Sequence, residues 1–123
     1  MVMSITNLGR SGLYDWLIQR LSAVAMTAYV FFLVAYIVLN PELDFEQWRT
    51  LYSHLWMRVF SLITLLSIVA HAWIGLWAVL TDYITPMTMG SKAMALRLLA
   101  QVILGLVAVT YTVWGIEILW GLY

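Results

Sequence analysis

The sequence predicts an all-α integral membrane protein, with three transmembrane helices in a small bundle that forms one membrane-anchor domain over residues 1–123. The chain is 64% hydrophobic and only 10% charged, whereas soluble domains carry about 25% charge. Its apolar residues gather in three uncharged runs at about 21–39, 59–81 and 98–116. At about 1.5 Å per residue, each run is long enough to cross a hydrocarbon core of about 30 Å.

Helix-ending residues separate the three runs. The first run stops at Asn40-Pro41, a dipeptide that ends helices. The second run stops at Asp82, and Pro86 and Gly90 predict a loop after it.

The segment 41–58 between the first two runs is acidic at its start and aromatic after that. Aromatic residues at the edge of a membrane typically form a belt at the level of the headgroups. The predicted belt residues are Trp48, Tyr52 and Trp56.

The distribution of basic residues predicts the orientation in the membrane, because cytoplasmic segments carry more lysine and arginine. The N-terminal segment and the second loop lie on one side and hold four basic residues. The first loop and the C-terminus lie on the other side and hold two. The N-terminus is therefore predicted to be cytoplasmic and the C-terminus periplasmic. The two sets are Arg10, Arg20, Lys92 and Arg97 against Arg49 and Arg58.

Composition also excludes several classes of protein. The net charge is zero with no basic cluster, so nothing indicates nucleic-acid binding. The chain has no cysteine, which excludes an iron–sulfur cluster held by its own thiolates. The segment 1–20 contains Asp15 and lacks the pattern of a cleaved signal. A three-helix bundle has little interior, so we expect the chain to assemble with others.

Small and hydroxylated residues mark one face of the second and third runs, and close helix contacts in lipid favour such residues. In the second run they lie within an arc of about 120°, and Trp73 and Trp77 lie opposite. In the first run Arg20, Ala23 and Thr27 share a side. The two marked faces consist of Ser61, Thr64, Ser67, His71, Gly75, Ala78 and Asp82, and of Arg97, Gln101, Gly105, Ala108, Thr112 and Gly115.

His71 lies near the middle of the second run, where an ionisable side chain is costly and marks a functional site. Three interpretations stay open: a haem-iron ligand, a proton-relay group, or a buried histidine bonded to a neighbouring hydroxyl or carbonyl. The only other histidine, His54, lies in the loop on the far side. A six-coordinate haem would therefore need its second ligand from another chain. Gly75, one turn from His71, would leave room for a flat macrocycle.

Asp82 and Tyr83 close the second run on the predicted cytoplasmic side. They are either ordinary residues of the membrane border or a site for a quinone head. In the second case the phenol donates a hydrogen bond, and the carboxylate orients the phenol or passes protons. Arg20 lies on the same side, where it either extends to the headgroups or pairs with a haem propionate.

Two segments carry a resemblance to a known family, "LGRSGLYDWLIQR" at residues 8–20 and "HAWIGLWAVLTDY" at residues 71–83. With the length, the three helices and the topology, they resemble the hydrophobic membrane anchor subunits of succinate dehydrogenase. The second motif is specific because it joins a mid-helix histidine to an Asp-Tyr pair at the helix end. One departure is the segment 84–97, which is longer than the short turn usual in the family.

The resemblance implies that His71 ligates the iron of haem b, with the other ligand from a cytochrome b556 anchor subunit. It implies that Tyr83 hydrogen-bonds ubiquinone, that Asp82 supports the quinone site and that Arg20 lies near the haem propionates. The further partners implied are an iron–sulfur subunit and a flavoprotein subunit, in a respiratory complex II of the bacterial inner membrane. The chain itself would not oxidise succinate, since it has no nucleotide-binding glycine motif.

Two other functions stay open. A fumarate reductase type anchor would bind another quinone and could lack haem, although His71 argues against a version without haem. A small proton-coupled transporter would use His71 and Asp82 as a relay, but it should also carry an acidic residue inside the membrane. Here the acidic residues all lie at helix borders.

Overall fold

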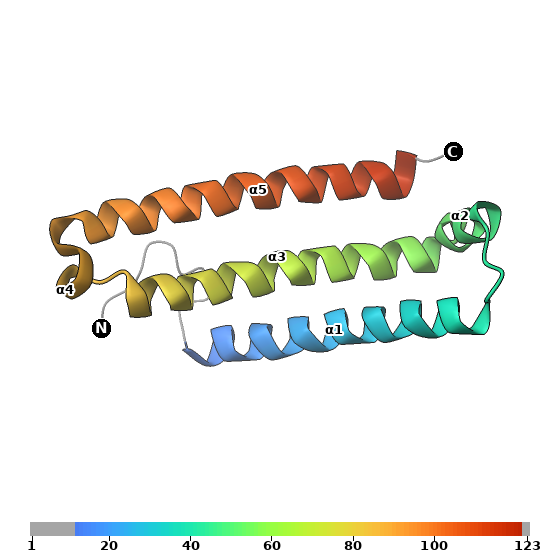
Figure 1. Cartoon of the computed structure of the whole chain (residues 1–123), viewed down its shortest axis with the longest axis horizontal. Coiled ribbons are helices and arrows are strands. Elements are labelled where there is room, and N and C mark those ends of the chain that lie inside the picture. The colour runs from blue at the N-terminus through green and yellow to red at the C-terminus, as the bar shows by residue number, and fades with distance from the viewer. Residues whose placement is uncertain (1–11, 122–123) are drawn as a thin grey trace.

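The protein is a layer of three long helices. The computed structural model describes residues 12–121, except for the side chain of Pro86. The long helices are α1 (Gly12–Leu39), α3 (Leu55–Tyr83) and α5 (Ala93–Gly121). They lie side by side, with α3 in the middle and α1 and α5 on its two flanks (Figure 1). All three are long and apolar enough to cross a membrane, which confirms the predicted fold class.

Each long helix extends beyond the uncharged run from which it was predicted. The prediction counted only uncharged residues, but a helix continues past the hydrocarbon into the headgroup region, where charged side chains are solvated. Asp15 lies in the first turn of α1, and Arg58 lies within the first turns of α3. The end of α1 at Leu39 agrees with the stop predicted from Asn40-Pro41.

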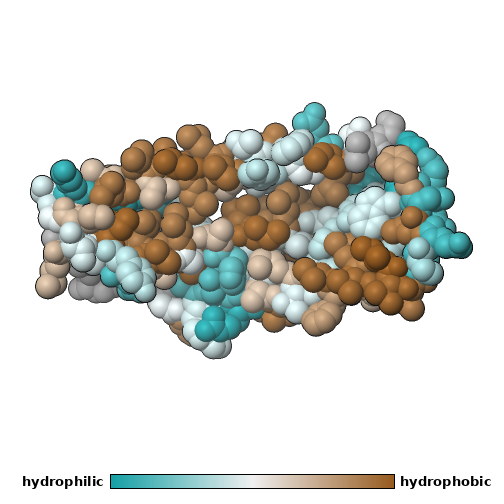
Figure 2. All heavy atoms as spheres, in the orientation of Figure 1, coloured by the Kyte–Doolittle hydropathy of each residue, from teal (hydrophilic) through white to brown (hydrophobic). Residues whose placement is uncertain are grey.

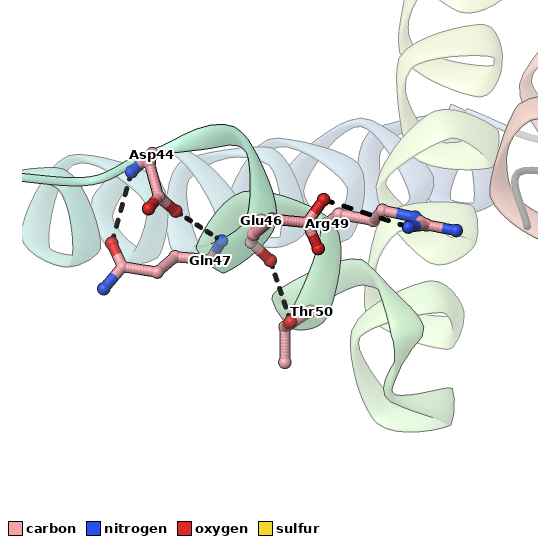
Figure 3. A network of polar contacts seen from close by, with 5 residues as sticks. All are labelled: Asp44, Glu46, Gln47, Arg49 and Thr50. Carbon is pink, nitrogen blue, oxygen red and sulfur yellow. Dashed lines mark hydrogen bonds and ion pairs between the residues drawn. The ribbon is translucent and has the colours of Figure 1, made fainter.

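A short helix that the sequence analysis did not predict, α2 (Phe45–Ser53), precedes α3. Its first turn is closed by a reciprocal pair of hydrogen bonds (Figure 3). The Gln47 backbone N–H donates to Asp44 Oδ1 at 2.8 Å, and the Asp44 N–H donates to Gln47 Oε1 at 3.2 Å. The exposed pair of Arg49 and Glu46, 4.0 Å apart, adds little stability. The pattern Asp-x-x-Gln was the available signal, since it matches the capping box that begins helices.

A network of hydroxyl groups joins α2 to the ends of α1 and α3. The Tyr29 hydroxyl oxygen lies 2.7 Å from that of Tyr52 and 2.6 Å from Oγ of Ser61. Burial, and then the bond with Tyr29, raises the pKa of the Tyr52 phenol, so this hydroxyl stays protonated. The Trp48 ring packs between those of Tyr52 and Tyr36, with centroid separations of 5.3 and 6.5 Å. Trp48 and Tyr52, two of the predicted belt residues, therefore also hold α2 against α1.

The connection between α3 and α5 is helical rather than a simple loop. It consists of α4 (Pro86–Met89) and a 3₁₀ turn, η1 (Gly90–Lys92). Gly90 has a φ of 64°, a left-handed conformation that glycine adopts without strain. The segment that departs from the resembled family therefore has regular structure of its own.

Very little of the chain forms an interior. Among the described residues, Met57 is the only large side chain that is less than 2% exposed. Apolar surface extends over much of the face in Figure 2, and hydrophilic atoms gather at the end that carries α2. Such a surface needs lipid or other protein chains to cover it.

The central helix uses two opposite faces, one for each flanking helix. Its small and hydroxylated face meets α1. There Ser61 is hydrogen-bonded to Tyr29, and His71 is hydrogen-bonded to Ser22. Its other face meets α5, where a Cβ on Gly105 would lie 3.9 Å from the Trp73 ring. The predicted inner face of α5 is thus confirmed. On the side of α1 that Arg20, Ala23 and Thr27 share, Arg20 and Thr27 are exposed and Ala23 is half-buried. In α1 the hydrogen bonds to this face come from Tyr29 and from the buried Ser22.

Two glycines of α5 differ in the space around them, and this difference predicts different responses to alanine. A Cβ at Gly115 would lie 2.5 Å from Leu65 Cδ2, whereas one at Gly105 meets only an ordinary contact. Both substitutions gain the same helix propensity. We therefore expect Gly115→Ala to be less stable than Gly105→Ala by about 1 kcal/mol, because Leu65 must leave its preferred rotamer. Titration with SDS in detergent, followed by circular dichroism, measures the difference. Equal stabilities would mean that α5 does not pack on α3 in this register.

Candidate functional site

His71 lies at the contact of α3 with α1, opposite Ser22. Its Nδ1 is 3.1 Å from Ser22 Oγ, and Ser22 Oγ donates to the backbone oxygen of Gln19 at 3.0 Å. Ser22 is only 5% exposed, while the imidazole is half-buried. Among residues 12–121, the other ring nitrogen, Nε2, has no hydrogen-bond partner. The imidazole is therefore held by one nitrogen and has the other available to a group outside this chain.

The side chain of Gln19 lies beside this contact, close to Gly75. A Cβ on Gly75 would lie 3.7 Å from Gln19 Nε2, an ordinary contact, so Gly75 does not border an empty space at that point. Gln19 Oε1 is buried and has no hydrogen-bond donor within the described part of the chain. Buried acceptors are almost always paired. A donor from beyond the described residues would complete the contact.

Arg20 does not join His71 in this structure. It follows Gln19 on α1 and lies two positions before Ser22, so its side chain points about 160° away from that of Ser22 around the helix. Its guanidinium carbon lies 5.0 Å from the centre of the Trp16 ring, and the side chain is exposed. Because α1 begins at Gly12, Arg20 lies two turns inside the helix rather than at its start.

Asp82 and Tyr83 lie at the last turn of α3, and both side chains are exposed, Tyr83 by 71%. Tyr83 is twelve residues from His71, which corresponds to about 18 Å along the helix. This end of α3 lies at the end of the bundle that carries α4 (Figure 1). This exposed pair is accessible to a ligand or to another chain.

The backbone around Tyr83 is held by two side chains that the sequence analysis did not assign to the site. Arg97 of α5 donates from Nε to the Ile84 oxygen at 2.7 Å and from Nη2 to the Thr81 oxygen at 3.5 Å. Thr88 Oγ1 of α4 donates to the Tyr83 oxygen at 2.9 Å. These bonds satisfy carbonyls that a helix end leaves open. An arginine at the start of the next helix was the available signal for such a cap.

His54 lies between α2 and α3, with its ring stacked on Trp56 at a centroid distance of 6.0 Å. His71 is about 26 Å farther along α3. His54 and His71 of one molecule are therefore too far apart to bind the same iron. In the described residues no group of three or more histidine, cysteine or acidic side chains could hold a metal ion. A single axial ligand to an iron already held by a porphyrin needs no such group.

A cavity of about 530 Å³ lies at the opposite end of the bundle from Tyr83. Its walls come from α2, including Phe45 and Trp48, and from Ile118 near the end of α5. This end is separated from Tyr83 by the length of α3, about 42 Å. The cavity is therefore distinct from the predicted quinone position.

The fold and these positions define a multi-pass membrane protein with a histidine held between two of its helices. Residues 4–114 match the profile of the succinate dehydrogenase/fumarate reductase transmembrane subunits, and the chain belongs to this family. It is 38% identical over 111 residues to the succinate dehydrogenase hydrophobic membrane anchor subunit of Coxiella burnetii (strain RSA 493 / Nine Mile phase I), with 90% of each chain covered. The resemblance found from the two sequence motifs is thereby confirmed.

Proposed function

We propose that this chain is a membrane anchor of a succinate dehydrogenase that shares a haem b and forms part of a ubiquinone site. The family membership supports the anchor role. The observation that carries the haem assignment is the half-buried His71, which is held through Nδ1 and whose Nε2 has no partner among residues 12–121.

The residues present fit a haem whose iron takes one ligand from this chain. His71 would bind the iron through Nε2, and Ser22 would orient the ring. The buried Gln19 Oε1 is an acceptor that a donor from beyond the described residues could satisfy. The other iron ligand would come from a cytochrome b556 subunit, since His54 is too distant. When bound, the haem supplies one-electron storage. Arg20 points to a different side of α1 from Ser22. It would therefore contact a haem propionate only if the haem or the partner subunit also reaches that side.

Tyr83 would donate a hydrogen bond from its exposed phenol to a carbonyl oxygen of ubiquinone. Asp82, beside it, would orient the phenol or deliver protons, because reduction of a quinone takes up two protons. Arg97 and Thr88 fix the backbone that carries both side chains. The site is incomplete within this chain, because both side chains face outward, and a partner would supply its other wall.

The partners would be the cytochrome b556 subunit within the bilayer and, on the cytoplasmic side, an iron–sulfur subunit and a flavoprotein subunit. Electrons from succinate would reach Tyr83's end of the bundle through these two soluble subunits. The excess of basic residues supports a cytoplasmic position for that end, and the chain would lie in the inner membrane of a bacterial cell. The family covers fumarate reductases as well, and the succinate dehydrogenase relative favours succinate oxidation. Family membership also favours an anchor over a transporter.

Co-purification tests the proposal as a whole. A tagged version of this chain, expressed with the genes of its host complex, should bring down a second membrane subunit, an iron–sulfur protein and a flavoprotein in equal amounts. The purified assembly should show a haem b absorption band and reduce ubiquinone with succinate. Isolation of this chain as a homo-oligomer without those subunits would refute the anchor role.

A further inference from the structure

We propose that Ser22 is a positioning residue that fixes His71 in the tautomer with its proton on Nδ1, so that Nε2 keeps a lone pair for iron. This inference rests on the proposed haem ligation, because it concerns the same imidazole. It adds Ser22 of α1, a residue to which the sequence analysis gave no role, to the surroundings of the proposed iron ligand on α3.

The Ser22 hydroxyl carries a single hydrogen, which limits the bonds that it can donate. A serine hydroxyl donates one hydrogen bond and accepts others. The backbone oxygen of Gln19, 3.0 Å from Ser22 Oγ, can only accept, so it takes that hydrogen. The contact at 3.1 Å between Ser22 Oγ and His71 Nδ1 is then a hydrogen bond only if Nδ1 is the donor. Both contacts form together only when Nδ1 carries the proton.

The other tautomer lacks this support. With the proton on Nε2, Ser22 would have to turn its hydrogen from Gln19 toward a bare Nδ1. Ser22 is only 5% exposed, so water has little access to compensate for the lost bond. That tautomer also has no lone pair on Nε2, and it could not bind iron there. The hydroxyl therefore selects the form of His71 that can ligate.

The same hydrogen bond should influence the iron electronically. A ligating histidine that donates its second N–H to an acceptor becomes a stronger base, and loss of that acceptor typically costs 10- to 100-fold in metal affinity. A stronger base favours the ferric over the ferrous state. Removal of the Ser22 hydroxyl should thus weaken haem retention and raise the haem reduction potential.

The test compares Ser22 variants in the assembled complex. In Ser22→Ala we expect haem affinity to fall by about 10- to 100-fold and the haem potential to rise. Ser22→Thr keeps a hydroxyl and should retain the wild-type potential. Thr27→Ala, which removes an exposed hydroxyl elsewhere on α1, is the matched control and should change neither quantity. Haem content by pyridine haemochrome and potential by redox titration are the two readouts.

Three results would overturn the inference. One is an unchanged haem potential and content in Ser22→Ala, and another is a Thr variant that behaves like the Ala variant. If Ser22→Ala does not assemble, Ser22→Cys replaces it in the test, because the sulfur keeps the side-chain volume but accepts hydrogen bonds weakly. An unchanged haem potential in Ser22→Cys is the third result that would overturn the inference. Parallel measurement of His71→Ala separates the two proposals. If His71→Ala leaves the haem unaltered, the haem assignment itself fails, whereas an altered haem beside unaffected Ser22 variants refutes only the role of Ser22.

Discussion

Replacing His71 by alanine should alter the haem of the assembled complex more than any other single substitution in this chain. The substitution removes the only imidazole of α3 that could reach an iron at the middle of the bundle. We expect the low-spin spectrum to change and the potential to shift. Haem content should fall without disappearing, since water or the partner's residues can partly substitute. Optical and paramagnetic resonance spectra of the purified complex measure the effect.

His54→Ala is the matched control for this experiment. It removes the chain's other histidine, which lies about 26 Å away along α3 and stacks on Trp56. Its haem spectrum should equal that of the wild type. A His71→Ala complex with an unchanged low-spin spectrum and an unchanged potential would return His71 to the role of an ordinary buried histidine bonded to Ser22.

The three long helices were predictable because membrane insertion imposes a length and a composition that a sequence displays directly. The beginnings of those helices were not predictable, because charged residues such as Asp15 and Arg58 bound the apolar run but do not end the helix. The helix α2 was missed for a related reason. Its polar face and short length resemble a loop, and only the Asp44-Gln47 pair signals that a helix begins there.

The site was predictable in part. His71, Asp82 and Tyr83 stand out in the sequence because polar residues are rare in or beside an apolar run, and the structure places His71 at the predicted helix interface. Ser22 did not stand out, since a serine in a membrane helix is common and its partner is 49 residues away. Contacts of that kind depend on how two helices align, which no local pattern records. The separation of Arg20 from His71 has the same origin.

The quinone proposal depends on Tyr83, and Tyr83→Phe tests it with little disturbance to the fold. The ring stays, and the phenol is already 71% exposed and outside the helix contacts. Loss of one hydrogen bond to an uncharged acceptor costs about 0.5–1.5 kcal/mol, which corresponds to a two- to twelvefold weaker interaction with the quinone. If the bond also orients the ring for electron and proton transfer, the rate falls further than that.

We therefore expect Tyr83→Phe to lose most of its succinate–ubiquinone reductase activity while the reduction of a soluble dye by succinate stays near normal. The dye takes electrons before the membrane site, so this split locates the defect at the quinone. Asp82→Asn should show the same split more weakly, because it acts on the phenol or on proton delivery. Tyr111→Phe, at an exposed tyrosine of α5, is the matched control and should affect neither assay. Normal quinone reduction in Tyr83→Phe would make Tyr83 an ordinary residue of the membrane border, because the geometry offers that phenol no other function within the described chain.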